Sequence, residues 1–254
     1  MVRGLWRSRG RPAAYHRRVE FNTGAIVRLG WSRLLGLPDD SLDPARNPVR
    51  TVRVESEREV MVVRLWDTFV VVGPGWLQER STDLDPADLL DQSALLRCCD
   101  GHPARLVGQA RLAYTDHYVR PQQPGLRRLE DVPVDDQPTA AAAVERACPP
   151  DDVAEVGLAE MGRVFVTLDD REQPTAGAGY DEWQGILGHL GVLTPPEQRR
   201  AGHGTVAAAL ALNDALDVGL VPQWRARTEN VASRRLARRL GFTEVGAQTT
   251  VLLT

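Results

Sequence analysis

The sequence predicts a mixed α/β fold, because segments with strand character and segments with helix character alternate along the chain. The clearest example is residues 186–217, where an apolar strand, a Pro-Pro break, a glycine-containing turn and an Ala/Leu-rich helix follow one another. Residues 126–254 as a whole give the order β-α-β-β-β-α-β-α-β. This order fits a mixed sheet with helices on both faces.

The N-terminal part of the chain also has α/β character. One helix is expected from Asn22, which can cap it, and another from Asp85-Pro86, with proline at its first position. Runs rich in β-branched residues indicate strands at residues 49–54, 60–65, 69–72 and 106–114. The order of these elements permits, but does not require, a degenerate second copy of the C-terminal domain.

Two segments divide the chain. Residues 118–125 read YVRPQQPG, and their two prolines and glycine are typical of a linker. Residues 1–18 contain six arginines and no acidic residue, which indicates a flexible basic arm or, alternatively, an arm that binds phosphate or a partner. We therefore predict a basic arm at 1–20, an α/β domain at 21–117, a linker at 118–125 and a second domain at 126–254.

The second domain is expected to begin with a strand at residues 126–132 and an Ala-rich helix at 140–147. A hairpin should follow, and then a strand, the helix from Thr205 to Gly219, another strand and a last helix capped by Asn230. The strands of this part are expected at residues 162–168, 175–183, 186–193 and 221–227.

Composition limits the classes of function. The net charge of −3 argues against a dedicated nucleic-acid binder, although all 31 basic residues are arginines. No run approaches the 18 or more apolar residues of a membrane span. The three cysteines lack metal-ligand spacing, so no metal is expected. We expect a cytoplasmic protein, and the sequence allows a homodimer.

The turn at residues 199–204, Arg-Arg-Ala-Gly-His-Gly, has the features of an anion site. Gly202 and Gly204 let the backbone curve tightly with its N–H groups turned inward. The helix that follows points its positive dipole end at the same place, and Arg199 and Arg200 add positive charge. Such a turn suits a pyrophosphate.

The pattern Arg199-x-x-Gly202-x-Gly204 after an apolar strand resembles the coenzyme-A signature of the GNAT superfamily of N-acetyltransferases. Asn230-x-x-Ser233 and Leu240-Gly241-Phe242 resemble the closing helix of that superfamily, so the similarity covers about residues 125–254. The nearest alternative is the Rossmann fingerprint, but the turn is separated from its strand by eight residues, and no acidic residue follows near position 222.

The resemblance implies a GNAT-like fold whose two central strands, at 190–193 and 221–227, are splayed apart. It also implies that acetyl-CoA is the co-substrate and that its pantetheine arm lies along the first of these strands. The residues expected to bind it are Leu190, Val192, Thr194, Arg199, Arg200, Gly202, His203, Gly204, Thr205 and Asn230.

The implied reaction is acetyl transfer from acetyl-CoA to a primary amine of a small molecule or protein. Candidates for the general base are Glu182, His189 and Asp181, and Ser233 is a candidate proton donor to the leaving thiolate. Many members of the superfamily carry a tyrosine seven residues after the motif asparagine, where this chain has Ala237. The alternative function is therefore a non-catalytic acyl-CoA-binding or sensing module.

Overall fold

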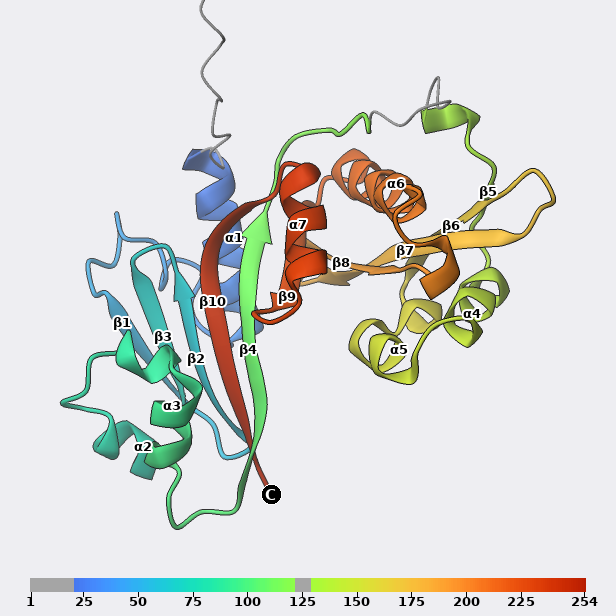
Figure 1. Cartoon of the computed structure of the whole chain (residues 1–254). Helices are drawn as coiled ribbons and strands as arrows, with labels where there is room; N and C mark the ends of the chain where they lie inside the picture. Colours follow the sequence, from blue (N-terminus) through green and yellow to red (C-terminus); the bar gives the residue numbers. More distant parts are fainter. Residues whose placement is uncertain (1–20, 122–128) are drawn as a thin grey trace, which may run out of the picture.

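The computed structural model describes residues 21–121 and 129–254. The predicted arm at 1–20 and part of the predicted linker lie outside these ranges. All ten strands of the described chain form one mixed sheet, in the order β1-β3-β2-β10-β4-β9-β8-β7-β6-β5 (Figure 1). The pairs β1–β3 and β8–β9 are parallel and the others antiparallel, so the predicted mixed α/β class is confirmed.

The N-terminal elements lie close to their predicted positions. The valine-rich strands bury consecutive residues, because both faces of the sheet are covered here: Val60 and Val62 pack on one face and Val63 on the other. The elements are α1 Phe21–Leu34, β1 Thr51–Glu55, β2 Glu59–Leu65, β3 Thr68–Gly73, α2 Gly75–Arg80, a 3₁₀ turn at Asp88–Leu90, α3 Gln92–Cys98 and β4 Ala104–Tyr114.

The C-terminal elements agree with the prediction from residue 138 onward, with one helix added. The added helix, α5, begins at Pro150 with Pro149 as its N-cap, because a proline fits the first helical turn. The elements are α4 Pro138–Arg146, α5 Pro150–Val156, β6 Arg163–Leu168, β7 Pro174–Trp183, β8 Leu187–Leu193, α6 His203–Asp217, β9 Val221–Arg227, α7 Val231–Arg239 and β10 Thr243–Leu253.

The strand predicted at residues 126–132 is wrong in its described part. Leu129–Asp131 forms a 3₁₀ turn, and the first strand, β5, is only Val134–Asp135. Two consecutive acidic residues, Glu130 and Asp131, followed by Pro133, disfavour a strand there.

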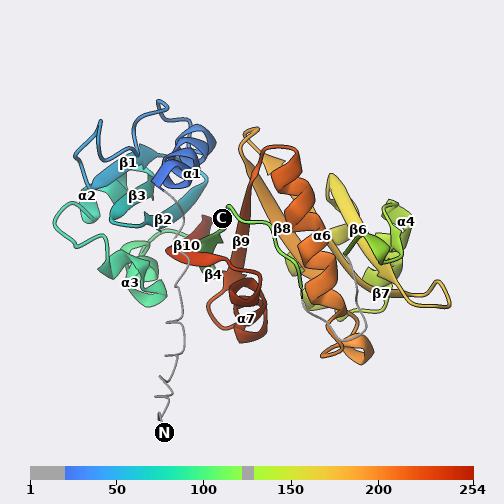
Figure 2. The ribbon, with the colours of Figure 1, turned by 90° about the horizontal axis from the view of Figure 1, so that it is seen from above.

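Strands from the two halves of the chain interleave. β10, the last strand, pairs with β2 on one side and with β4 on the other. β4 in turn lies between β10 and β9, so a strand from the N-terminal half separates two strands of the C-terminal half. Viewed from above, β9 lies between the strands of the N-terminal half, beside α1, and the strands that pack on α6 (Figure 2). The division into two domains at 118–125 stays a prediction. One sheet contains strands from both sides of this segment.

Helices cover both faces of the sheet. We call one the α6 face, where α6 and α7 pack on Trp224, Ala226 and Ala113. The other is the α1 face, where Trp31 of α1 packs with Tyr114 and Leu187. Helices α4 and α5 lie on this second face as well, around Leu193 and Val166. Within the described ranges, none of the helices has the length and apolar character needed to cross a bilayer.

Candidate functional site

The predicted opening between two central strands is present. β8 and β9 pair in parallel from Leu187 with Val221 to Leu190 with Trp224, and the pairing stops there. β8 continues to Leu193 while β9 turns away to pair with β4 up to Arg227. Among the described strands, none pairs with the edge of Gly191–Leu193 that faces β9, although the other edge pairs with β7. The backbone groups of this edge are available to a ligand.

The glycine turn stands at the open end of this split. Gly202 caps α6 with φ 93°, and Arg200 also has a positive φ of 69°. The first helical residue is His203, two residues before the predicted start at Thr205. The N–H groups of Thr205 and Val206 donate to Gly202 O, whereas those of His203 and Gly204 have no partner among the described residues. Two free donors at a helix N-terminus suit an anion.

Gly204 also serves packing. A Cβ placed on it would lie 2.5 Å from Thr194 Oγ1, so the start of α6 touches the residue after β8. A side chain at 204 would push the turn away from the strand before it met any ligand. The glycine therefore brings the free N–H groups close to the end of β8.

The two arginines of the turn differ in role. Arg199 Nε donates to Thr194 O over 3.0 Å, and its Nη2 lies 2.7 Å from Asp152 Oδ2 of α5. Its charge is thus already paired, contrary to the expectation of a free cation at the turn. Arg200 is exposed and leaves its charge to the solvent side of the turn.

The motif residues on α7 form a cap and a hydrogen bond to the sheet. Asn230 Oδ1 accepts from the N–H of Ser233 over 3.0 Å, as predicted for a helix cap. Ser233 Oγ accepts from the indole Nε1 of Trp224 over 2.9 Å. Because an indole nitrogen only donates, the hydroxyl proton of Ser233 stays free to donate elsewhere. Ala237 is buried beside a cavity of about 50 Å³ between α7 and the sheet.

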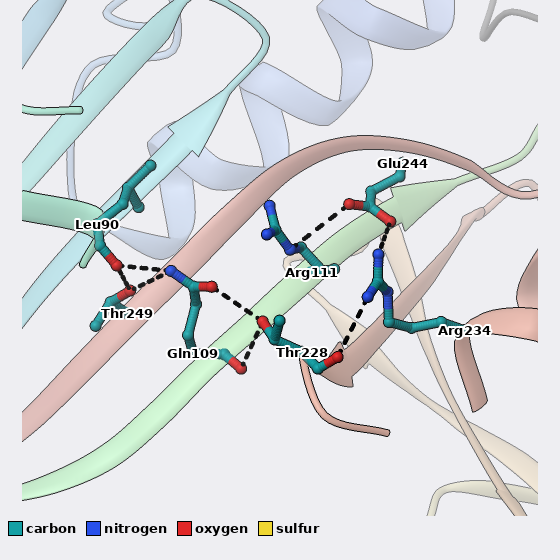
Figure 3. A network of polar contacts seen from close by, with 7 residues as sticks. All are labelled: Leu90, Gln109, Arg111, Thr228, Arg234, Glu244 and Thr249. Atoms are coloured by element: carbon teal, nitrogen blue, oxygen red, sulfur yellow. Dashed lines mark hydrogen bonds and ion pairs between the residues drawn. The ribbon is translucent and has the colours of Figure 1, made fainter. Parts of the chain in front are cut away.

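A polar network ties α7 and the end of β9 to both halves of the chain (Figure 3). Arg234 of α7 donates to Thr228 O and to Glu244 Oε2 over 3.2 and 3.1 Å. Thr228 Oγ1 in turn donates to Gln109 Oε1 over 3.0 Å. The other members of the network are Leu90, Arg111 and Thr249. These contacts fix the helix that carries Asn230 and Ser233.

A row of polar residues crosses the α1 face just before the strands split. Register places Asp181 of β7 opposite His189 of β8, His189 opposite Gln223 of β9, and Gln223 opposite Tyr114 of β4. Tyr114 Oη accepts from Trp31 Nε1 and donates to Gln223 Oε1, each over 2.7 Å. We call these residues, without Trp31, the polar row.

The polar row fixes the state of His189. With its Oε1 occupied by Tyr114, Gln223 donates through Nε2 to His189 Nδ1 over 3.2 Å. The ring of His189 also stacks on Trp183, with centroids 4.4 Å apart. Burial, with Arg225 nearby, lowers the pKa of His189 to about 4, although Asp181 acts in the opposite direction. His189 is thus neutral, with its proton on Nε2, and its free group is a donor, which disfavours the predicted role as a base.

The structure separates the three predicted catalytic residues. Tyr180 bonds to Asp214 of α6, so Glu182, two residues further along β7, lies on the α6 face and is exposed. Asp181 and His189 lie on the α1 face instead. Ser233 belongs to α7 and the α6 face. Of the two carboxylates considered from the sequence, Asp181 belongs to the polar row and Glu182 does not.

Sequence reasoning missed Tyr114, Gln223 and Arg225. Nothing in their local sequence marks them, because each reaches the site only through pairing between distant strands. Arg225 is the first residue of β9 beyond the last pair with β8. These residues could have been found only by predicting that β4 pairs with β9, because that pairing brings Tyr114 next to Gln223.

A sequence model described as GNAT acetyltransferase matches residues 188–251. This range begins in β8 and includes the glycine turn, α6, β9 and α7. The resemblance to the GNAT superfamily is confirmed. A comparison with curated proteins finds no match.

Several solved GNAT structures are similar to this chain at low identity. A GCN5-related N-acetyltransferase from Kribbella flavida has 18% identity and a TM-score of 0.45, covering 63% of each chain. A GNAT-family acetyltransferase from Colwellia psychrerythraea has 14% identity and a TM-score of 0.44, covering 63% of this chain and 62% of that one. A GCN5-related N-acetyltransferase from Sphaerobacter thermophilus has 16% identity and a TM-score of 0.43, covering 63% and 56%. This chain therefore spans less than two-thirds of the length of each of the three.

Proposed function

We propose that this protein is an N-acetyltransferase that moves an acetyl group from acetyl-CoA to a primary amine of a small molecule or protein. The observation that carries the proposal is the split between β8 and β9 with the glycine turn at its open end. This arrangement offers a strand edge without a partner and two free N–H groups in one place, inside the segment that the GNAT model matches.

The residues of the split fit the chemistry of acetyl-CoA. The edge at Gly191–Leu193 would pair with the amide groups of the pantetheine arm, and the N–H groups of His203 and Gly204 would hold the pyrophosphate. Arg200 would add an exposed positive charge, whereas Arg199 holds the turn in shape. When bound, acetyl-CoA supplies the acetyl group as an activated thioester.

Two side chains can move the protons that such a transfer requires. Asp181 uses Oδ1 to accept from the N–H of Gly162 over 3.0 Å, and its Oδ2 has no partner among the described residues. Oδ2 can therefore take a proton from an amine on the α1 face. Ser233 holds a hydroxyl proton that its bond to Trp224 leaves free. Glu182 points to the other face and exposes its carboxylate to solvent, so we assign it no role.

A non-catalytic acyl-CoA sensor is the second candidate. It is favoured by Ala237, which offers no proton, and by His189, whose Nδ1 is already occupied by Gln223. A sensor would keep the ligand site and lack turnover.

Two measurements test the proposal. Acetyl-CoA should raise the thermal midpoint, because a ligand of the folded state stabilises it by mass action, and NAD should not. Thiol release from acetyl-CoA should then depend on an added amine and fall in Asp181→Asn. A shift with NAD alone would refute acyl-CoA binding. Acetyl-CoA binding without thiol release across a broad amine panel would leave the sensor as the function.

A further inference from the structure

Arg225 is a half-buried cation at the head of the split. It precedes Ala226, which packs on the α6 face, and so shares the α1 face with Gln223 and Arg227. Leu190 and Trp224 form the last pair of β8 with β9, so Arg225 has no partner on β8, and its partner on β4 is the buried Leu112. Arg225 therefore lies on β9 at the point where the two strands part.

The charge of Arg225 is not balanced by the protein. Among the described residues it has no ion pair and no hydrogen bond. The titratable groups around it are Tyr114 and His189, both neutral, and the carboxylate of Glu59, which lies beyond ion-pair distance. Burial lowers the pKa of Arg225 and outweighs the opposing effects of Tyr114 and Glu59. No nitrogen of Arg225 is both buried and without a hydrogen bond, so the guanidinium keeps contact with water while it lacks an anionic partner among the described residues. It is therefore accessible to an anionic ligand, with which it would form charge-assisted hydrogen bonds.

Arg227 shows the ordinary alternative on the same strand. It lies on the same face two residues later, is exposed, and pairs with Glu155 of α5 at 3.9 Å. Its charge is satisfied by the fold and by water. Arg225, two residues earlier on the same face, lacks such an ion pair among the described residues. The absence of an anionic partner is therefore particular to its position at the split.

The groups around Arg225 have complementary character. Asp181 lies two strands away on the same face, in register with Gln223 rather than with Arg225, so about 12 Å separate the backbones of Asp181 and Arg225. Asp181 offers a free carboxylate oxygen. His189, between them, offers only its Nε2–H as a donor. The α1 face therefore presents a proton acceptor, Asp181, at one end, and two hydrogen-bond donors, His189 and Arg225, toward the other.

From this arrangement we infer that the acceptor amine carries a carboxylate, which Arg225 binds while Asp181 receives the amine. The inference rests on the acetyl-transfer function proposed above and names the substrate class of the same site. A guanidinium and a carboxylate form two parallel hydrogen bonds, which fixes orientation as well as charge. The Nε2–H of His189 adds a third donor to the same group.

The test compares matched amines. Each amino acid of a panel is assayed beside its carboxamide and beside the amine that remains when the carboxylate is removed. The parent should prefer the carboxylate form by about 100-fold or more in kcat/KM, because a site built for a polar group rejects an analogue that lacks it. Arg225→Met should abolish this preference, Arg225→Lys should keep part of it, and Arg227→Met should leave it unchanged.

Binding is measured separately from turnover. The same compounds are titrated by calorimetry into the protein saturated with acetyl-CoA, and carboxylate-dependent binding should be lost in Arg225→Met while acetyl-CoA binding persists. This readout also decides the matter if the protein is a sensor without turnover. Equal binding of an amino acid and its carboxamide by the parent, or an unchanged preference in Arg225→Met, would overturn the inference. Transfer to simple amines with no carboxylate preference would overturn it while leaving the proposed function intact.

Discussion

At the residue scale, hydrogen-bond partners decide what a side chain can do. His189 has the chemical type of a general base, yet Gln223 occupies its Nδ1 and the proton resides on Nε2. Gln223 is held in that orientation by Tyr114, which is held by the donor-only indole of Trp31. The role of His189 therefore depends on a residue of α1 more than 150 positions earlier in the chain.

The buried neutral state of His189 predicts that acid destabilises the fold. Its pKa is about 4 when folded and about 6.5 when unfolded, so between these values the unfolded chain binds a proton that the folded protein does not. The free energy of unfolding should fall as pH falls through this window, by about 3 kcal/mol at most for a shift of this size. Chemical denaturation at pH 7 and pH 4.5 measures the loss.

His189→Gln is the control, since carboxylates elsewhere in the protein also titrate below pH 5. The variant should lose less stability than the parent over the same range. Identical pH profiles for the two proteins would mean that His189 is not buried in its neutral form.

Gly204 gives a second prediction at this scale. Gly204→Ala should lower the thermal midpoint, because the new Cβ would lie 2.5 Å from Thr194 Oγ1. Removing the hydroxyl in Thr194→Ala should relieve the contact, so the double variant should be more stable than the sum of the single effects predicts. A double-mutant cycle by thermal denaturation measures this coupling, and strict additivity would show that the contact is relaxed by other movements.

At the element scale, the local signals of the sequence were sufficient for β8, α6, β9 and α7. An apolar run, two glycines and a capping asparagine each act within a few residues, so their positions follow from local rules. The polar row did not follow, because Tyr114 and Gln223 meet only through the register of β4 with β9. The predicted first strand is wrong at Leu129–Asp131, because Glu130 and Asp131, followed by Pro133, disfavour a strand there.

Helix α7 carries the prediction about the missing tyrosine. Many members of the superfamily carry a tyrosine at the position of Ala237, but the cavity beside Ala237 is about 50 Å³, space for a few waters and too small for a phenol ring. A phenol ring there should separate α7 from Trp224 and cost about 1–3 kcal/mol of stability. Thermal denaturation measures this, with Ala237→Ser as the small control.

Proton delivery is then expected from Ser233. Ser233→Ala should slow thiol release by about 10-fold or more, because the hydroxyl proton is lost, while acetyl-CoA affinity should persist, because the Asn230 cap does not use the Ser233 hydroxyl. The substitution also removes the acceptor of Trp224 Nε1. Steady-state kinetics and the acetyl-CoA thermal shift separate the two effects. Unchanged turnover in this variant would assign proton delivery to water or to another group.

At the scale of the whole molecule, one sheet contains strands from both of the domains that the sequence predicts. The polar row needs Tyr114 from β4, and the network around Arg234 needs Gln109 from the same strand. Because β4 fills the space between β9 and β10, the N-terminal half supplies part of the core and part of the site. A domain boundary read from proline and glycine content marks where the chain passes between halves, and gives no information on which strands pair.

The two halves should therefore not fold independently. A chain cut within residues 118–125 gives a C-terminal piece in which β9 and β10 face a gap, and an N-terminal piece in which Leu112 and Tyr114 lose their cover. Open strand edges and exposed apolar side chains both oppose a stable fold. We expect each piece alone to show no cooperative unfolding by circular dichroism, and the two mixed during refolding to regain one transition and bind acetyl-CoA. A C-terminal piece that unfolds cooperatively by itself would show that β4 adds to a sheet already stable without it.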